Sequence, residues 1–352
     1  MLCCAPDSFT TGLSMNTNAQ TVLTVSNIAK SYTSYKKKPG FLPSLKSLFY
    51  RESVEVKALK PLSFNIHAGE FVGVLGPNGA GKTTTLKILT GLVVPSSGKA
   101  LAFGQYDTSK STPDYLRQLG MVMGQRQQLL SDLPASDSFA LAQALYEIPG
   151  PLFEERVAFY TELLDVGDKV DIPVRKLSLG ERMKLELIQA LLHQPKILFL
   201  DEPTIGLDFE AARKIRNFLL RLNQEFHTTI LLTSHYMYEV EELCDRIAVV
   251  NHGQIIALDT PAALKAQSSG DCVIVLQTPN GEQSLQGKLK SMQKYLSRVH
   301  TSGETLSLYT KTPSKILNEL TPLLEQNIIT NIEVRNSTLE DVYVDIIKNK
   351  AA

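Results

Sequence analysis

The stretch from residue 76 to residue 83 has the composition and order of a loop that binds phosphate. It follows the apolar run 71–75 and reads Gly76, Pro77, Asn78, Gly79, Ala80, Gly81, Lys82 and Thr83. Glycines let the backbone curl so that successive N–H groups point at phosphate oxygens, and a helix that starts at the loop presents the positive end of its dipole. Lys82 can then reach the β- and γ-phosphates of a nucleotide, and the Thr83 hydroxyl can ligate Mg²⁺. The alternative is a chance glycine-rich turn, which the strand before the loop and the helix after it disfavour.

Two carboxylates stand at the end of a second apolar run. Residues 197–200 are all apolar, and Asp201 and Glu202 follow directly. Such a run is typical of a central strand that is buried on both faces and whose carboxyl end opens onto a bound nucleotide. We expect Asp201 to hold the Mg²⁺ shell and Glu202 to orient and polarise the attacking water. Paired acids could also form a solvated sheet edge or a helix cap, but the phosphate-binding loop upstream favours the catalytic interpretation.

The elements that must position these groups alternate between β-like and helical runs. The β-like runs are 22–25, 71–75, 197–200, 230–233 and 247–250, with amphipathic helical stretches between several of them. This rhythm predicts an α/β fold with a largely parallel sheet. With 352 residues and 43% hydrophobic content, the chain can bury one large core and still carry a small second domain.

Charge and cysteine content narrow the function classes. Lys plus Arg and Asp plus Glu are 36 each, so the net charge of zero directs no broad field at nucleic acid, and no nucleic-acid partner is expected. The four cysteines are too few and too irregularly spaced for a zinc site or a disulfide framework, which indicates a reducing compartment. No apolar run approaches the roughly 20 residues that span a bilayer, and the first residues lack a signal-peptide pattern. We therefore expect a cytoplasmic protein.

Composition shifts divide the chain into three parts. Residues 1–20 are rich in Ser, Thr and Asn without a helix or strand period, which predicts a disordered tail. Residues 21–268 are expected to form the nucleotide-binding domain. The pattern pauses at the polar residues 267–270, and a shorter mixture of strands and helices at 269–352 predicts a small α+β C-terminal domain.

Further segments lie between and after the two chemical motifs, in an order that makes the chain resemble the ATPase subunits of ABC transporters, over roughly residues 21–265. The segments are Leu177, Ser178, Leu179, Gly180 and Glu181, similar to the family's signature; residues 203–208, similar to its D-loop and ending in Asp208; Thr233, Ser234 and His235, similar to its switch histidine; and Gln125, at the Q-loop position.

The resemblance implies a fold and a set of ligands. A P-loop NTPase core would carry an antiparallel β subdomain and a helical subdomain, and the cofactors would be ATP and Mg²⁺. Thr84 would complete the nucleotide-binding loop, and Gln125 would join Thr83 and Asp201 around the metal. Tyr32 occupies the position where the family places an aromatic ring against adenine, which can stack on a base without reading it. Tyr35 is a nearby competitor, and simple packing of Tyr32 is the alternative.

The family's mechanism needs two ATPase domains. They sandwich two ATP molecules, so that the P-loop of one subunit faces the signature residues Ser178, Gly180 and Glu181 of the other. Ser178 would cap the following helix and present its hydroxyl to the γ-phosphate of the partner's nucleotide. His235 would contact the same phosphate and organise the water with Glu202, which makes Lys82, Glu202 and His235 the catalytic set. The expected partner is a second copy of this chain, and a heterodimer stays open.

Two signature positions depart from the family pattern. Leu179 replaces a glycine and Glu181 replaces a glutamine. Ser178 and Glu181 have the spacing of a capping box, in which the acid bonds back to the N-cap N–H, and this spacing favours a role for Glu181 at the helix end. The alternative is a trans site whose contact with the nucleotide is tuned or weakened.

The resemblance also indicates a branch of the family. The residues around Gln125, the signature and the tail at 337–343 look like the drug, lipid and polysaccharide exporters, in which the permease is a separate membrane protein. An integral membrane permease is therefore an expected partner, and it would hold the ATPase at the inner face of the cell membrane. The alternative is an ABC ATPase that remodels a macromolecular complex without a permease. The substrate and the direction of transport stay open.

The segment between Tyr35 and Lys57 separates the aromatic position from the strand before the phosphate-binding loop more widely than is usual in ABC ATPases. It combines the basic residues Lys36, Lys37, Lys38, Lys46 and Arg51 with several apolar ones. This composition suits a peripheral contact with lipid headgroups or with a permease. A surface excursion that packs its apolar residues on the core is the alternative.

Overall fold

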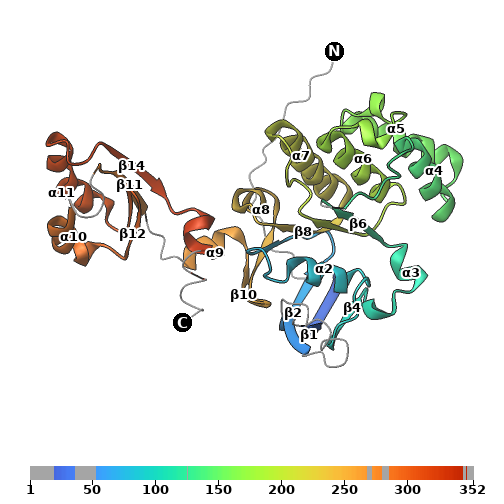
Figure 1. Cartoon of the computed structure of the whole chain (residues 1–352), viewed down its shortest axis with the longest axis horizontal. Helices are drawn as coiled ribbons and strands as arrows, with labels where there is room; N and C mark the ends of the chain where they lie inside the picture. Colours follow the sequence, from blue (N-terminus) through green and yellow to red (C-terminus); the bar gives the residue numbers. More distant parts are fainter. Residues whose placement is uncertain are drawn as a thin grey trace, which may run out of the picture.

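The computed structural model describes residues 20–35, 53–124, 126–267, 272–279, 285–343 and 346. Its strands form three sheets, and Figure 1 shows the first two in one body and the third at the other end of the molecule. Three sequence-based expectations lie wholly or mostly outside the described residues: the tail at 1–20, of which only Gln20 is described; the basic insertion at 36–56, of which only 53–56 are described; and the predicted magnesium ligand Gln125.

The central sheet carries both chemical segments. Its six strands run in the order β10-β9-β3-β8-β7-β6. They are β3 (Phe71–Leu75), β6 (Leu119–Met123), β7 (Ile197–Asp201), β8 (Thr229–Ser234), β9 (Arg246–Asn251) and β10 (Gln254–Asp259). Strands β9 to β6 pair in parallel, and β10 pairs with β9 antiparallel. Parallel strands covered on both faces are apolar throughout, which explains why four of the predicted β-like runs are strands of this sheet.

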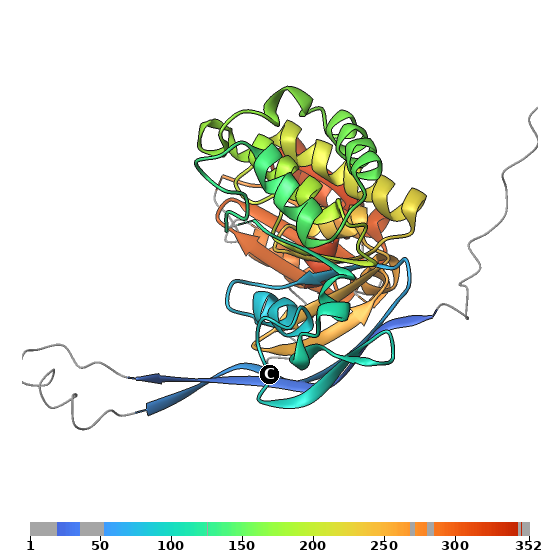
Figure 2. The ribbon, with the colours of Figure 1, turned by 90° about the vertical axis from the view of Figure 1, so that its right-hand side faces the viewer.

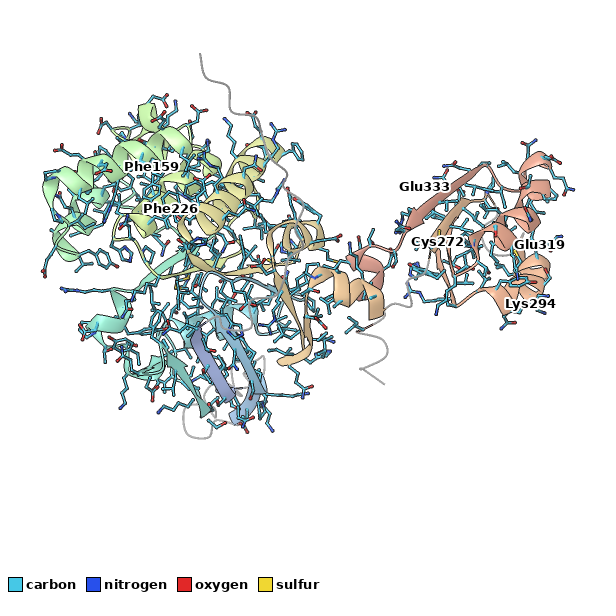
Figure 3. All side chains as sticks on the ribbon, turned by 180° about the vertical axis from the view of Figure 1, so that it is seen from behind. Phe159, Phe226, Cys272, Lys294, Glu319 and Glu333 are labelled. Carbon is cyan, nitrogen blue, oxygen red and sulfur yellow. The ribbon has the colours of Figure 1, made fainter. Side chains whose placement is uncertain are left out.

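Helices cover the central sheet. They are α2 (Lys82–Leu89), α3 (Pro113–Leu116), α4 (Ala135–Leu145), α5 (Gly150–Leu163), α6 (Leu179–Leu191), α7 (Phe209–Phe226), α8 (Met237–Leu243) and α9 (Pro261–Gln267). Short 3₁₀ turns occur at Thr108–Lys110, Gly167–Lys169 and Val174–Lys176. In Figures 1 and 2, α4 to α7 gather on one side of the sheet, and α2 lies on the other side. Figure 3 shows Phe159 of α5 against Phe226 of α7, and the two rings pack edge to face with their centroids 5.8 Å apart.

An antiparallel sheet lies beyond α2. It runs in the order β2-β1-β4-β5, with β1 at Thr21–Tyr35, β2 at Ser53–His67, β4 at Ser97–Ala102 and β5 at Tyr106–Asp107. The predicted run 22–25 is a strand, but it belongs to β1 of this sheet rather than to the parallel core. The reason is its pairing, because β1 lies antiparallel between β2 and β4.

The third sheet has a core of its own. It runs β12-β13-β11-β14, formed by β11 (Cys272–Gln277), β12 (Arg298–Ser302), β13 (Thr305–Thr310) and β14 (Asn331–Asn336). Helices α10 (Gln286–Met292) and α11 (Pro313–Glu325) follow β11 and β13, and a 3₁₀ turn spans Gln293–Tyr295. Alternate strand residues such as Ile274, Leu276 and Leu308 are buried with Leu320 of α11, as period-two patterning requires. The predicted α+β character of this region is confirmed.

Across the described ranges, no helix combines the length and the apolar character needed to cross a membrane. Cys244 and Cys272 are free thiols.

Candidate active site

The phosphate-binding loop connects β3 to α2 in the predicted way. Helix α2 begins at Lys82, and Gly81 before it has φ 104°, a conformation that L side chains rarely adopt. A Cβ at Gly81 would also lie 2.5 Å from a Leu59 methyl carbon, and one at Gly76 would lie 2.3 Å from the Val250 carbonyl oxygen. The loop therefore needs glycine at both positions, and it ends at the start of a helix, where the first N–H groups lack partners within the helix.

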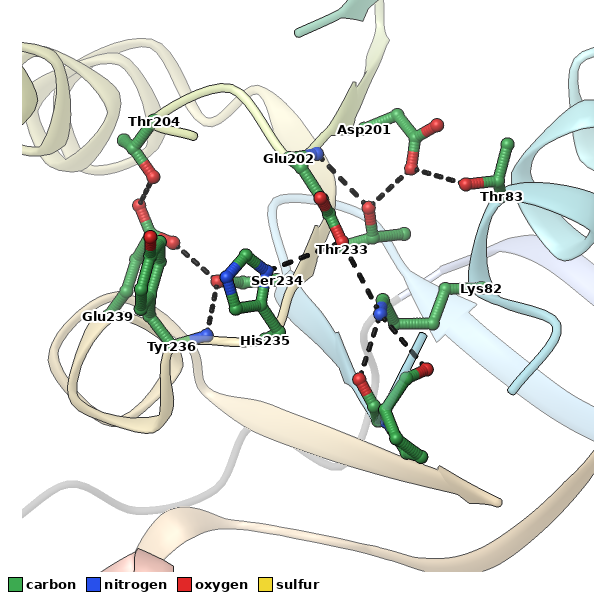
Figure 4. Close-up of polar contacts among 12 residues, drawn as sticks. Lys82, Thr83, Asp201, Glu202, Thr204, Thr233, Ser234, His235, Tyr236 and Glu239 are labelled. Atoms are coloured by element: carbon green, nitrogen blue, oxygen red, sulfur yellow. Dashed lines mark hydrogen bonds and ion pairs between the residues drawn. The ribbon is translucent and has the colours of Figure 1, made fainter. Parts of the chain in front are cut away.

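Lys82 holds its ammonium inside the loop. The side chain is 5% exposed, and Nζ donates to the Gly76 carbonyl at 2.8 Å. The same Nζ lies 3.4 Å from Oε1 of Glu202 (Figure 4). The structure thus brings together the loop lysine and a carboxylate that lies far from it in the sequence.

Asp201 and Thr83 meet on the other side of the site. The Thr83 hydroxyl donates to Oδ1 of Asp201 at 3.0 Å, and the Thr233 hydroxyl donates to the same oxygen at 2.6 Å. Figure 4 shows this pair beside Glu202. A hydroxyl and a carboxylate oxygen are the kind of hard donors that Mg²⁺ prefers. Thr83 and Asp201 therefore fit a shared metal.

Glu202 is held in an unusual backbone conformation. Its φ is 53°, in the left-handed region, and its N–H donates to both the carbonyl and the hydroxyl of Thr233 at 3.1 Å. A Cβ on Gly124 would lie 2.2 Å from the Glu202 carbonyl oxygen, so this turn also needs glycine at 124. Strained backbone of this kind is found at functional sites, where the surroundings over-determine it.

His235 approaches the same carboxylate. Its Nδ1 lies 3.5 Å from Oε1 of Glu202, and its ring packs against the Tyr236 ring with centroids 4.1 Å apart. The Glu202 side chain is 11% exposed and the His235 side chain 33% exposed. Glu202 therefore lies between the ammonium of Lys82 and the imidazole of His235, as Figure 4 shows.

An open cleft of about 660 Å³ is bordered by Lys82, Thr83, Asp201 and Glu202. Eight of the predicted nucleotide ligands and both strand-end carboxylates line it: Pro77, Asn78, Gly79, Ala80, Gly81, Lys82, Thr83, Thr84, Asp201 and Glu202. Three cations on its walls were not predicted, namely Lys57, Lys87 and Arg126. Lys87 follows Thr83 by one helical turn on α2, so its place near the loop could have been inferred from the helix period. Four cations in one cleft suit a polyphosphate.

Other predicted residues do not line this cleft, among them Gly76, which contacts Lys82, and His235, which contacts Glu202. Tyr32 is 41% exposed on β1, and it pairs across the strands with Val56, which lines the cleft. Lys30 places its ammonium over the Tyr32 ring at 5.2 Å. Ser178, Gly180, Glu181 and Asp208 do not line the cleft of their own chain.

The predicted capping box at the signature is confirmed. Ser178 is the N-cap of α6: its hydroxyl accepts from the Glu181 N–H at 3.2 Å, and the Glu181 carboxylate accepts from the Ser178 N–H at 2.9 Å. These bonds lower the pKa of Glu181, against the opposing effect of burial. A Cβ at Gly180 would lie 2.9 Å from that of Ala211, so α6 begins in close contact with α7.

Comparison with known proteins decides the family. The family model described as "ABC transporter" matches residues 59–205. The Nod factor export ATP-binding protein I of Ralstonia nicotianae is 33% identical over 288 residues, which are 80% of this chain and 87% of that protein. The chain belongs to the ABC transporter ATP-binding family. As such it is an ATP-binding subunit with ATPase activity.

Other relatives of this ABC ATPase carry export or resistance names. The linearmycin resistance ATP-binding protein LnrL of Bacillus subtilis is 34% identical, over 62% of this chain and 69% of that protein. The probable multidrug ABC transporter ATP-binding protein YbhF of Escherichia coli is 38% identical, over 60% of this chain and 36% of that longer protein.

Solved structures agree with the fold of the ABC ATPase. A dimeric post-hydrolysis state of the ATP-binding cassette MJ0796, bound to ADP and Pi, covers 68% of this chain and 98% of its own, with a TM-score of 0.56 and 24% identity. The cbiO1 protein of Clostridium perfringens, part of the cbiONQ transporter complex, covers 71% of this chain and 92% of its own, with a TM-score of 0.57 and 25% identity.

Proposed function

We propose that this ABC ATPase works as a nucleotide-sandwich dimer that couples hydrolysis of Mg-ATP to export through a separate membrane permease. One observation carries the proposal: Lys82 and Glu202 contact each other in a cleft lined by the phosphate-binding loop, and His235 contacts Glu202 and completes a row of three. Phosphoryl transfer needs mainly positioning and charge stabilisation, and this row supplies both.

Each residue of the row has a distinct task. Lys82 and the loop N–H groups bind the β- and γ-phosphates, and Lys57, Lys87 and Arg126 add positive charge around them. Glu202 orients and polarises the attacking water. His235 contacts the γ-phosphate and holds that water against Glu202. Displacement of Lys82 from Glu202 by the γ-phosphate would leave the carboxylate free for the water.

Thr83 and Asp201 would hold Mg²⁺, with Gln125 as the third ligand on the family pattern. Their shared contact at 3.0 Å supports this assignment. The ion would neutralise charge on the β- and γ-phosphate oxygens. Tyr32 would stack on adenine, since it lies beside Val56 at the edge of the cleft.

The signature would complete the cleft of a second subunit. Ser178, Gly180 and Glu181 sit at the N-terminus of α6, where the Ser178 hydroxyl and the helix dipole favour a phosphate. They do not line the cleft of their own chain, which suits action in trans, with Asp208 of the D-loop between the subunits. The dimeric state solved for the similar cassette MJ0796 supports this arrangement.

A permease would dock on the helical side of the subunit. A groove of about 430 Å³ between the central sheet and the helices has Leu92, Leu116, Leu141 and Leu145 on its walls, each at least 40% exposed. Apolar surface of this extent suits a partner protein. The export names of the relatives support the direction, and a permease would place the ATPase at the inner face of the cell membrane.

We also assign the domain boundaries. The nucleotide-binding domain spans 21–268 and the accessory domain 269–352, because the third core cluster contains residues from Ile274 to Ile332 and the other two contain residues up to Leu264. The C-terminal residues Leu339, Tyr343 and Ile346 are the exception, since they pack in the first cluster.

Two measurements test the proposal. Purified protein should be monomeric without nucleotide and should dimerise with ATP when hydrolysis is blocked, as followed by size-exclusion chromatography. Tagged protein extracted from membranes in detergent should co-purify with a polytopic membrane protein. Hydrolysis without a polytopic partner would favour an ABC ATPase that acts without a permease.

A further inference from the structure

A buried carboxylate outside the cleft joins two loops of the active site. Glu239 on α8 is 0% exposed. Its Oε1 accepts a hydrogen bond from the Thr204 hydroxyl at 2.7 Å, and its Oε2 accepts one from the Ser234 hydroxyl at 2.6 Å. Figure 4 shows the three side chains next to His235. Because Thr204 belongs to the D-loop segment and Ser234 precedes His235, one carboxylate holds both loops.

The switch segment is fixed on the Ser234 side. The Ser234 hydroxyl, besides donating to Glu239, accepts from the Tyr236 N–H at 3.0 Å. This bond closes a turn around His235, whose ring packs on the Tyr236 ring. The direction of the His235 ring therefore depends on the anchor of Ser234.

The D-loop is fixed on the Thr204 side. Thr204 is 4% exposed and lies two residues after Glu202. The Ile205 N–H donates to the Glu202 carbonyl at 3.3 Å, so the turn that contains Thr204 begins at Glu202. The backbone of Glu202 and the ring of His235 are thus tied to the same buried side chain.

Such a carboxylate is costly to bury. Burial raises the pKa of Glu239, and the hydrogen bonds from Ser234 and Thr204 oppose that shift, as do Arg216 and His235 at longer range. An apolar side chain of similar volume would fill the space without this cost. An apolar side chain, however, could not accept the two short hydrogen bonds by which the carboxylate connects two different loops.

We propose that Glu239 is a positioning residue that holds the D-loop and the switch histidine in one register, so that Glu202 and His235 face the same water. The proposal rests on the roles proposed above for Glu202 and His235. The D-loop would meet the second subunit. Glu239 would therefore couple the position of the D-loop to the position of His235 in the same chain.

A matched pair of variants tests the D-loop side. Thr204→Val keeps the branched shape and removes the donor, whereas Thr204→Ser keeps the donor. We expect the kcat of Thr204→Val to fall about tenfold with KM for ATP within about twofold of wild type, and Thr204→Ser to stay within about twofold in both. The kcat of Glu239→Gln, which keeps one acceptor oxygen, should lie between the kcat of Thr204→Val and that of wild type. Glu241→Gln on the same helix, where Glu241 pairs with Lys265 at 2.6 Å, is the control.

The readouts separate positioning from folding. Thermal unfolding is recorded for every variant, and equal kcat for Thr204→Val and Thr204→Ser, with or without a lower melting temperature, overturns the proposal. So does a raised KM at unchanged kcat. Glu202→Gln is the reference for the underlying mechanism: if that variant is as active as wild type, the proposed function fails, whereas an inactive Glu202→Gln with a fully active Thr204→Val rejects the role of Glu239 alone.

Discussion

At the scale of single residues, the site is determined by how Glu202 is held. A non-glycine residue in the left-handed region costs on the order of 1 kcal/mol or more, and the hydrogen bonds that the Glu202 N–H donates to the carbonyl and hydroxyl of Thr233 keep it there. The result is a carboxylate that faces Lys82 and His235 at 3.4 and 3.5 Å. The position of the side chain lets it orient a water, and its negative charge lets it polarise that water.

The first prediction concerns Glu202→Gln. The amide keeps the size of the side chain but cannot polarise water as a carboxylate does, so ATP hydrolysis should fall by about 10² to 10⁴. The affinity for ATP, measured by equilibrium binding, should stay the same or rise, since one negative charge near the phosphates is removed. A variant that hydrolyses ATP at nearly the wild-type rate would show that Glu202 does not have the role given to it.

The second prediction concerns Lys82→Ala. The variant removes the charge that lies deepest in the loop, and its ammonium is the donor aimed at the phosphates. Nucleotide affinity should therefore fall by about tenfold or more, and hydrolysis should fall with it. Lys99→Ala, a change at an exposed pair with Asp107, is the control. Unchanged ATP affinity in Lys82→Ala would count against the phosphate contact.

Residues within motifs could be predicted, and residues that only support them could not. Lys82, Asp201, Glu202 and His235 follow runs of fixed type and spacing. Glu239 carries no such signal, because one glutamate on a helix with several others reads as part of a solvated face. Its buried carboxylate is bound by the hydroxyl of Thr204, a residue 35 positions away in the chain.

At the scale of elements, the start of α6 explains a departure from the family pattern. Ser178 and Glu181 exchange two hydrogen bonds, and Lys169 lies 3.6 Å from Glu181. The acid at 181 is therefore occupied by its own helix end and by a neighbouring cation. This geometry favours the capping interpretation over an electrostatic brake on the trans site.

The third prediction separates those two interpretations. Glu181→Gln can keep the bond to the Ser178 N–H, so ATP turnover should change less than about twofold and the melting temperature should barely move. Glu181→Ala should instead lose about 1 kcal/mol of stability, because the cap is broken. Both are measured by thermal unfolding and by ATPase rate. A large rise in turnover for Glu181→Gln would show that the charge restrains the partner's site.

The strands show which elements a sequence can reveal. The runs at 71–75 and 197–200 are fully apolar because β3 and β7 are covered on both faces. Strand β2 at Ser53–His67 mixes polar and apolar residues, since one face of its sheet is open to solvent, and it was not predicted. The sheet to which 22–25 belongs depends on distant partners in β2 and β4.

At the scale of the whole molecule, the tail at 337–343 connects the third sheet to the main core. Leu339 and Tyr343 pack in the core cluster that contains Leu264 of α9. Between them, Asp341 accepts hydrogen bonds from Tyr309 of β13 and from Arg335 at the end of β14, each at 2.6 Å. The tail therefore binds the nucleotide-binding domain with its apolar residues and the accessory domain with its acid.

The fourth prediction is that Asp341→Asn loosens this connection. The Asp341 side chain is 9% exposed, and its charge-assisted bonds to Arg335 and Tyr309 should contribute about 2 kcal/mol. The variant should melt several degrees below wild type and should be cleaved faster by protease between the two domains. Glu340→Gln, at the exposed neighbour of Asp341, is the control and should match wild type in both measurements.

The stability difference between wild type and Asp341→Asn should also depend on pH. Burial raises the pKa of Asp341, but hydrogen bonds from Arg335, Tyr309 and Thr338 outweigh burial and leave the pKa well below its usual range. A carboxyl whose pKa is depressed on folding stabilises the protein above its unfolded pKa, about 3.9, and the stabilisation is lost as the pH falls towards the folded pKa. The difference in melting temperature between wild type and Asp341→Asn should therefore be constant from about pH 8 to pH 5 and should become smaller below about pH 4. A difference that instead grows on acidification would mean that Asp341 is not held as a carboxylate by Arg335, and that the tail is anchored by its apolar residues alone.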